Sequence, residues 1–148
     1  MGSTYTYRVL RSSWGIFISI TADAFKGEGG SDGAVPLGEG VFLADATQGA
    51  GLSRDVMDML ARGLGLLSTE IASTGSGERI TVVVQEIRYN DCDFQEEGLA
   101  AAIHGWAIAE FGLPKRDIAV TFDREANRYV FDLPNPGDTA KPASPTNT

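Results

Sequence analysis

The residues best suited to acid–base chemistry are one histidine and the carboxylates near it in the sequence. His104 is the only histidine of the chain, and its imidazole would titrate near neutral pH, as a general acid or base requires. A carboxylate such as Asp91, Asp93 or Glu110 would have to orient the ring. One candidate function is therefore a small enzyme or ligand-binding protein of secondary metabolism. It would use His104 with Asp91 or Asp93 in a pocket between sheet and helices, gated by a loop over residues 26–40.

An acidic cluster lies just before the helix that carries this histidine. Asp91, Asp93, Glu96 and Glu97 could hold a hard cation or supply an acid and base pair. Their spacing is not that of an EF-hand loop, and Asp93 with Glu96 has the D-x-x-E spacing of a capping box, where negative charge near a helix start is favourable. We therefore expect no metal site and no cofactor.

The single cysteine does not indicate a nucleophile. Cys92 lies between Asp91 and Asp93, whose negative charges disfavour a thiolate. One cysteine cannot form an internal disulfide or supply a cysteine zinc site by itself. No serine lies in a G-x-S-x-G motif. These observations favour a non-catalytic protein in a reducing, cytoplasmic setting.

The first half of the chain predicts three strands and a helix. Residues 5–9 and 14–20 alternate apolar and polar side chains, which is typical of two strands of a hairpin. The many glycines between residues 26 and 40 predict an irregular loop, and residues 41–44 predict a third strand. Leu52 to Ile71 then carry apolar residues at spacings of three and four, which predicts an amphipathic helix.

Three residues of this first helix have a specific expected role. Ser53 is a good N-cap. Gly63 and Gly65 each weaken the helix by about 1 kcal/mol relative to alanine. We therefore expect both glycines to be kept for close packing against another backbone.

The second half predicts a strand, a helix and a hairpin. Residues 80–87 are β-branched on both faces at first, which is typical of a central strand. The second helix should begin at the capping box of Asp93 and Glu96 and stop at Gly112. It has apolar residues around most of its surface, so it must be buried on more than one side. Residues 118–133 then predict a closing hairpin.

These elements define an α+β fold with the order β-β-β-α-β-α-β-β. We expect a two-layer sandwich, with two helices packed on one face of a mostly antiparallel sheet that includes strands from Tyr5 to Leu133. At 148 residues, of which 43% are hydrophobic, the chain can build one core. Residues 4–133 are expected to form that single domain. Residues 134–148, rich in Pro, Thr and Ser, are expected to be a disordered tail.

The middle of the chain also carries a succession of short motifs. These are Gly38-x-Gly40-x-Phe42, Gly49 ahead of the first helix, the aliphatic strand Thr81 to Tyr89, and Glu97-Gly98-Leu99-Ala100 opening an alanine-rich helix. Over roughly Gly38 to Phe122, this succession resembles the fourth domain of translation elongation factor G, in the ribosomal-protein-S5 domain-2-like superfamily. The resemblance implies a core of three strands, helix, strand and helix, and a translation-associated role. The loop at residues 47–50 departs from the family in lacking its more extended tip.

The charge of the chain narrows the class of partner. A formal net charge of −8 disfavours anionic membranes, and nucleic acid outside a ribosome-type context, but is compatible with a basic protein partner. The sequence contains no run of about 18 apolar residues, so no membrane span is predicted. We therefore favour a non-catalytic protein-binding module, including the case of self-association, that uses an acidic face or the uncovered sheet surface. The expected binding residues are Asp91, Asp93, Glu96, Glu97, Ile108 and Phe111.

Overall fold

A computed structural model describes residues 2–27, 33–49 and 51–133 of the chain. The expected disordered tail at residues 134–148 lies outside these residues, as does the centre of the expected glycine-rich loop. Along the chain the elements are β1 (Ser3–Leu10), β2 (Gly15–Lys26), β3 (Val35–Gly38), β4 (Val41–Asp45), α1 (Arg54–Gly65), α2 (Ser68–Ser73), β5 (Ile80–Tyr89), the short 3-10 helix η1 (Asp91–Asp93), α3 (Glu97–Phe111), β6 (Val120–Asp123) and β7 (Arg128–Phe131).

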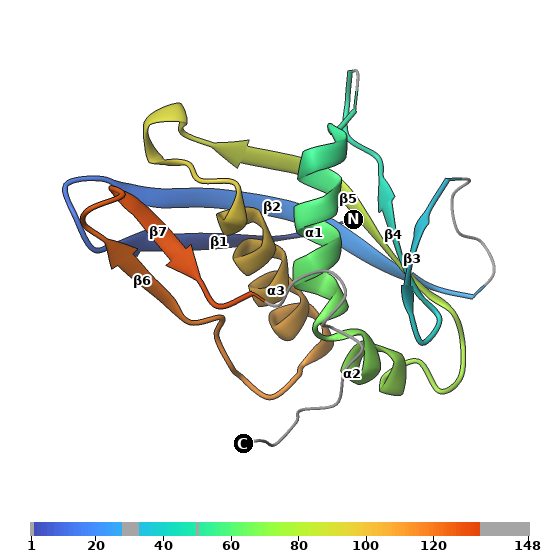
Figure 1. Cartoon of the computed structure of the whole chain (residues 1–148). Helices are drawn as coiled ribbons and strands as arrows, with labels where there is room; N and C mark the ends of the chain where they lie inside the picture. The colour runs from blue at the N-terminus through green and yellow to red at the C-terminus, as the bar shows by residue number, and fades with distance from the viewer. Residues whose placement is uncertain (1, 28–32, 50, 134–148) are drawn as a thin grey trace.

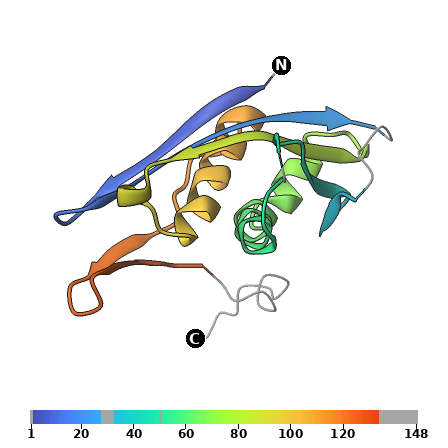
Figure 2. The ribbon, with the colours of Figure 1, turned by 90° about the horizontal axis from the view of Figure 1, so that it is seen from above.

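The main sheet has five strands in the order β1-β2-β5-β4-β3. Three of its four strand pairs are antiparallel, and β4 with β5 is the parallel pair. All the helices lie on one side of this sheet (Figures 1 and 2). The α+β sandwich predicted from the sequence is thus confirmed.

The connection between the two parallel strands has an unusual hand. The chain leaves β4, runs through α1 and α2 on the viewer's side of the sheet in Figure 1, and enters β5, which lies to the left of β4. With both strands pointing toward the top and left of that view, this crossover is left-handed. About 98% of such connections are right-handed, so the hand is a rare feature of this fold.

Strand β2 forms because its side chains alternate between the core and the open face. Ile16, Ile18 and Ile20 are buried under the helices, whereas Phe17 is 37% exposed and Phe25 50% exposed on the opposite face. That face is not covered by another element within the described residues (Figure 2). The alternation predicted for residues 14–20 is confirmed, and the strand continues to Lys26.

The predicted irregular loop over residues 26–40 is wrong at its end. Val35–Gly38 forms the edge strand β3, in which Pro36 lies opposite Phe42 of β4. A proline cannot donate to a ladder and is tolerated at a sheet edge. The glycine-rich composition hid this strand because it is short and has an irregular register at Gly38.

The predicted first helix is confirmed at its start and wrong in its length. The Ser53 hydroxyl accepts a hydrogen bond from the backbone N–H of Val56 at 3.3 Å. The helix ends at Gly65, and α2 begins only at Ser68. The N–H of Leu67 turns back to the carbonyl of Leu64 at 3.0 Å. This tight turn buries the side chains of both leucines against the sheet.

Gly63 has the packing role expected for it, and Gly65 does not. A Cβ atom on Gly63 would overlap the backbone of Ala100 in α3, lying 2.7 Å from its Cα. Helices α1 and α3 are therefore in backbone contact there. No atom lies within 4 Å of a Cβ built on Gly65, so this glycine is instead the last residue of α1.

The predicted capping box of the second helix is wrong. Asp93 closes the 3-10 turn of η1, and α3 begins at Glu97, with Glu96 at the N-cap and no side-chain cap hydrogen bond. Phe94 between them is extended, and its ring stacks on Tyr89 with centroids 4.3 Å apart. Aromatic packing has overridden the local helix signal.

Helix α3 is enclosed, as its apolar composition predicts. Its buried residues are Gly98, Leu99, Ala100, Ala101, Ala102, Ile103, His104, Trp106 and Ala107. Strands β1 and β2 cover one side, α1 another, and the β6–β7 hairpin lies across a third (Figure 2). The helix stops at Gly112, which adopts the left-handed conformation with φ of 66°, as expected for a glycine C-cap.

The closing hairpin forms its own two-stranded sheet, so the expectation of one sheet reaching Leu133 is wrong. β6 pairs with β7 alone among the described residues, and the hairpin returns over α3 instead of joining the sheet edge. Tyr129 holds it there, because its hydroxyl donates to the carbonyl of Trp14 at 2.7 Å and accepts from the N–H of Arg11 at 2.8 Å. Its ring also meets Trp14 edge-on.

Candidate functional site

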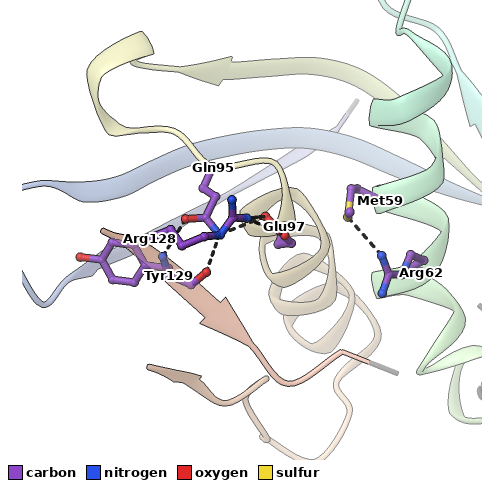
Figure 3. Close-up of polar contacts among 6 residues, drawn as sticks. All are labelled: Met59, Arg62, Gln95, Glu97, Arg128 and Tyr129. Atoms are coloured by element: carbon purple, nitrogen blue, oxygen red, sulfur yellow. Dashed lines mark hydrogen bonds and ion pairs between the residues drawn. The ribbon is translucent and has the colours of Figure 1, made fainter. Parts of the chain in front are cut away.

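The acidic residues before α3 are partly used inside the fold. Glu97 accepts an ion pair from Arg128 of β7 at 3.0 Å and a hydrogen bond from Gln95 at 3.0 Å. Gln95 also clamps the backbone of Tyr129, accepting from its N–H at 2.8 Å and donating to its carbonyl at 2.6 Å (Figure 3). Through these contacts, Glu97 helps to hold the β6–β7 hairpin against the start of α3.

The other expected binding residues lie apart from one another. Asp93 is half-buried in η1, and the Asp91 side chain lies outside the described part of the structure. Ile108 and Phe111 are half-buried and pack against the core, and the Phe111 ring lies edge-on to Trp106 with centroids 6.0 Å apart. Glu96 alone among the predicted residues lines a large cavity.

That cavity, which we call the acidic groove, has a volume of about 820 Å³. The β3–β4 turn forms one wall, and α1 with the start of α2 forms the other. Its lining residues are Pro36, Leu37, Gly38, Glu39, Asp55, Asp58, Met59, Ala61, Arg62, Gly65, Ser68, Thr69 and Glu96. Four carboxylates face one guanidinium in this lining, so the groove carries a net negative charge.

The fold positions these carboxylates through simple local geometry. Asp55 and Asp58 are three residues apart in α1 and therefore share one helix face. Glu39 sits in the turn between β3 and β4 with φ of 58°, between two glycines that allow the sharp reversal. Arg62, one turn after Asp58, places Nη1 3.9 Å from the sulfur of Met59 (Figure 3).

His104 lines a second cavity, together with Leu66 from the junction between α1 and α2. The His104 cavity has a volume of about 390 Å³ and is lined by Leu66, His104, Arg116, Asp117, Ile118, Ala119 and Asp132. His104 is only 4% exposed. Burial lowers the pKa of His104 below its usual 6.5, the Arg116 guanidinium lowers it further, and Asp117 and Glu70 oppose these effects. The net effect favours the neutral form of the ring.

The carboxylates that accompany His104 differ from those expected. Asp117 and Asp132 line its cavity, whereas Asp93 belongs to η1 before the start of α3. The segment that follows Gly112 brings Asp117 back along the helix that has just ended. Sequence spacing could not indicate this return, because it depends on where the hairpin docks.

A third cavity of about 750 Å³ lies between the start of α1 and the end of β5. Asp45 shapes the loop beside it, accepting from the N–H of Leu52 at 2.7 Å and from the N–H and hydroxyl of Thr47 at 2.8 and 2.6 Å. Burial raises the pKa of Asp45, but these hydrogen bonds outweigh it, and the pKa lies below 3.8. The carboxylate is thus a fixed anchor of this loop.

The described residues contain neither a metal-ligand cluster nor a membrane-spanning helix. Within residues 2–27, 33–49 and 51–133, no three His, Cys, Asp or Glu side chains are grouped so that they could hold a metal ion. Cys92 is exposed and unpaired. In that part of the chain, every helix is too short or too polar to cross a membrane.

Comparison with known proteins adds no family. No protein-family model matches this chain, and a search of curated proteins finds no significant relative. The fold and the cavities are therefore the observations from which a function can be argued.

Proposed function

We propose that this protein is a non-catalytic protein-binding module that takes a basic segment of a partner into the acidic groove. The observation that carries the proposal is the composition of the groove: Glu39, Asp55, Asp58 and Glu96 line a space of about 820 Å³ together with apolar side chains. A surface that combines carboxylates with an apolar wall is complementary to lysine or arginine residues flanking an apolar anchor.

The groove supports this function better than the other acidic surface does. Glu97 is engaged by Arg128 and Gln95, whereas Asp58 and Glu96 have no ion pair within the described residues. The net charge of −8 would attract a basic partner over a longer range and raise its association rate at low salt. Binding should therefore weaken as salt concentration rises.

The uncovered sheet face supports binding less directly. It exposes Phe17 and Phe25, but the guanidinium of Arg8 already lies 5.6 Å from the Phe17 ring centroid. Its central hydroxyls bond to one another across β1 and β2, as between Thr4 and Thr21 at 2.7 Å. This surface lacks the one-sided charge that would select a basic partner.

The test compares two variants with the same change in charge. Asp58→Asn with Glu96→Gln removes two carboxylates from the groove. Asp58 lies inside α1, which Ser53 caps, and Glu96 makes no side-chain cap hydrogen bond. Glu78→Gln with Glu125→Gln removes two exposed carboxylates elsewhere. Each immobilised protein is incubated with native lysate at low and high salt, and captured proteins are identified by mass spectrometry.

The proposal is supported if a captured protein with a basic segment binds the wild type and the control variant but does not bind the groove variant. A synthetic peptide of that segment should then bind at least tenfold more weakly to the groove variant in fluorescence anisotropy. Equal binding to both variants would reject the groove as the binding site.

Two finer statements accompany this proposal. A cytoplasmic location fits it, because the lone cysteine cannot form an internal disulfide. A translation-associated partner is suggested by the resemblance over Gly38 to Phe122, with which the order β4, α1, β5, α3 is compatible. Co-sedimentation of the protein with ribosomes tests it, and its absence from every ribosomal fraction would remove this version.

A further inference from the structure

The His104 cavity is lined by an imidazole, a guanidinium and carboxylates, whereas no imidazole lines the acidic groove. His104 is almost fully buried, with 4% of the residue exposed. Its ring forms part of the wall of the cavity, so a polar atom of a bound molecule would lie within reach of the imidazole.

Opposite charges face the same space. The Arg116 guanidinium is held by Glu70 of α2 through one nitrogen, Nη2, at 2.5 Å. A guanidinium carries five N–H donors, so most of them remain for a ligand carboxylate. Asp117 and Asp132 also line the cavity, and carboxylates accept hydrogen bonds from an ammonium group.

We propose that the His104 cavity binds a small zwitterion of the free amino-acid class. Its carboxylate would pair with Arg116, its ammonium with Asp117 or Asp132, and one polar atom would bond to His104. The apolar residues Leu66 and Ile118 would contact its side chain.

Other ligand classes fit this lining less well. A simple anion would meet two carboxylates against one guanidinium, which is unfavourable. A divalent metal lacks a suitable set of three ligands among the residues that the structure describes. A volume of about 390 Å³ is at the small end of the range for ligand pockets, which suits a molecule of amino-acid size.

The test is direct titration at pH 7.4 by isothermal calorimetry with each of the twenty L-amino acids. The best binder is then compared with the amine that lacks its carboxylate and the acid that lacks its ammonium. Both one-charge analogues should bind at least tenfold more weakly. Arg116→Gln and Asp117→Asn should each weaken the amino acid at least tenfold, whereas the exposed controls Arg124→Gln and Glu125→Gln should not.

Asp117 is exposed, so Asp117→Asn should fold even if Arg116→Gln does not, and circular dichroism establishes this. Failure of all twenty amino acids to bind at millimolar concentration would overturn the proposal, as would binding that both variants leave unchanged. The groove variant shares no lining residue with this cavity. It should bind the amino acid normally, which separates this inference from the proposed function.

Discussion

Gly63 of α1 lies directly against Ala100 of α3, with no room for a side chain between the two backbones. This contact fixes α1 against the buried helix α3, and α1 forms one wall of the acidic groove. A helix interior usually disfavours glycine, and here the close approach of the helices outweighs that cost.

Gly63→Ala should therefore destabilise the protein although alanine is the better helix former. We expect a loss of about 1–3 kcal/mol in the free energy of unfolding from overpacking, measured by urea denaturation. Gly65→Ala is the control, because open space surrounds that position, and its effect should lie within about 0.5 kcal/mol. Equal effects of the two substitutions would contradict the packing argument.

Gln95→Ala should loosen the hairpin. The amide of Gln95 satisfies both the N–H and the carbonyl of Tyr129, and Tyr129 is 1% exposed. Leaving these groups without partners should cost about 1–3 kcal/mol and speed hydrogen exchange of the Tyr129 amide. Glu97→Gln disturbs a neighbouring but more exposed ion pair, so it should cost less than about 1 kcal/mol. If Glu97→Gln destabilised the protein more than Gln95→Ala, the ion pair of Glu97, and not the amide of Gln95, would be the main contact that holds the hairpin.

The stability of the protein should fall as the pH drops below about 6.5, the usual pKa of histidine. Burial, with Arg116, lowers the pKa of His104 in the folded protein, so the unfolded chain binds a proton at a higher pH than the folded chain. The unfolding free energy therefore rises with pH between the two pKa values. Urea denaturation at pH 5.5 and 7.5 measures this slope, and His104→Gln should flatten it. An unchanged slope in that variant would assign the dependence to other groups.

Asp45→Ala should free the loop between β4 and α1. The carboxylate accepts from two backbone N–H groups, those of Thr47 and Leu52, which would lose their partner. Amide hydrogen exchange at these two residues should accelerate, with a loss of about 1–2 kcal/mol in stability. Asp58→Asn in α1 is the control, because the Asp58 side chain does not bond to these two amides. Both amides should stay protected from exchange in this variant. Faster exchange there as well would indicate general fraying of α1.

Local patterns in the sequence were sufficient for most of the elements. The alternation from Ile16 to Ile20 is a property of a strand with one face on a core, and it predicts β2 without any knowledge of its neighbours. Gly112 likewise stops α3 by its own conformational freedom. These predictions succeed because the cause lies within a few residues.

Predictions failed where the packing of large apolar side chains outweighed a local helix or capping signal. The capping box at Asp93 and Glu96 gave way to the stacking of Phe94 on Tyr89. The predicted continuous helix to Ile71 broke at Leu66 and Leu67, where a tight turn brings a second leucine into the core. Each local preference amounts to about 1 kcal/mol or less, and burial of one large apolar side chain exceeds it.

The candidate sites divide in the same way. Asp55 and Asp58 follow from helical spacing, and the sequence by itself determines that they share a face. Only the tertiary structure decided that Glu39 and Glu96 line the same groove, and that Asp117 and Asp132, not Asp91 or Asp93, would accompany His104. The reason is that these residues come from segments whose approach depends on the docking of a turn and a hairpin, and no periodicity in the chain encodes the distance between them.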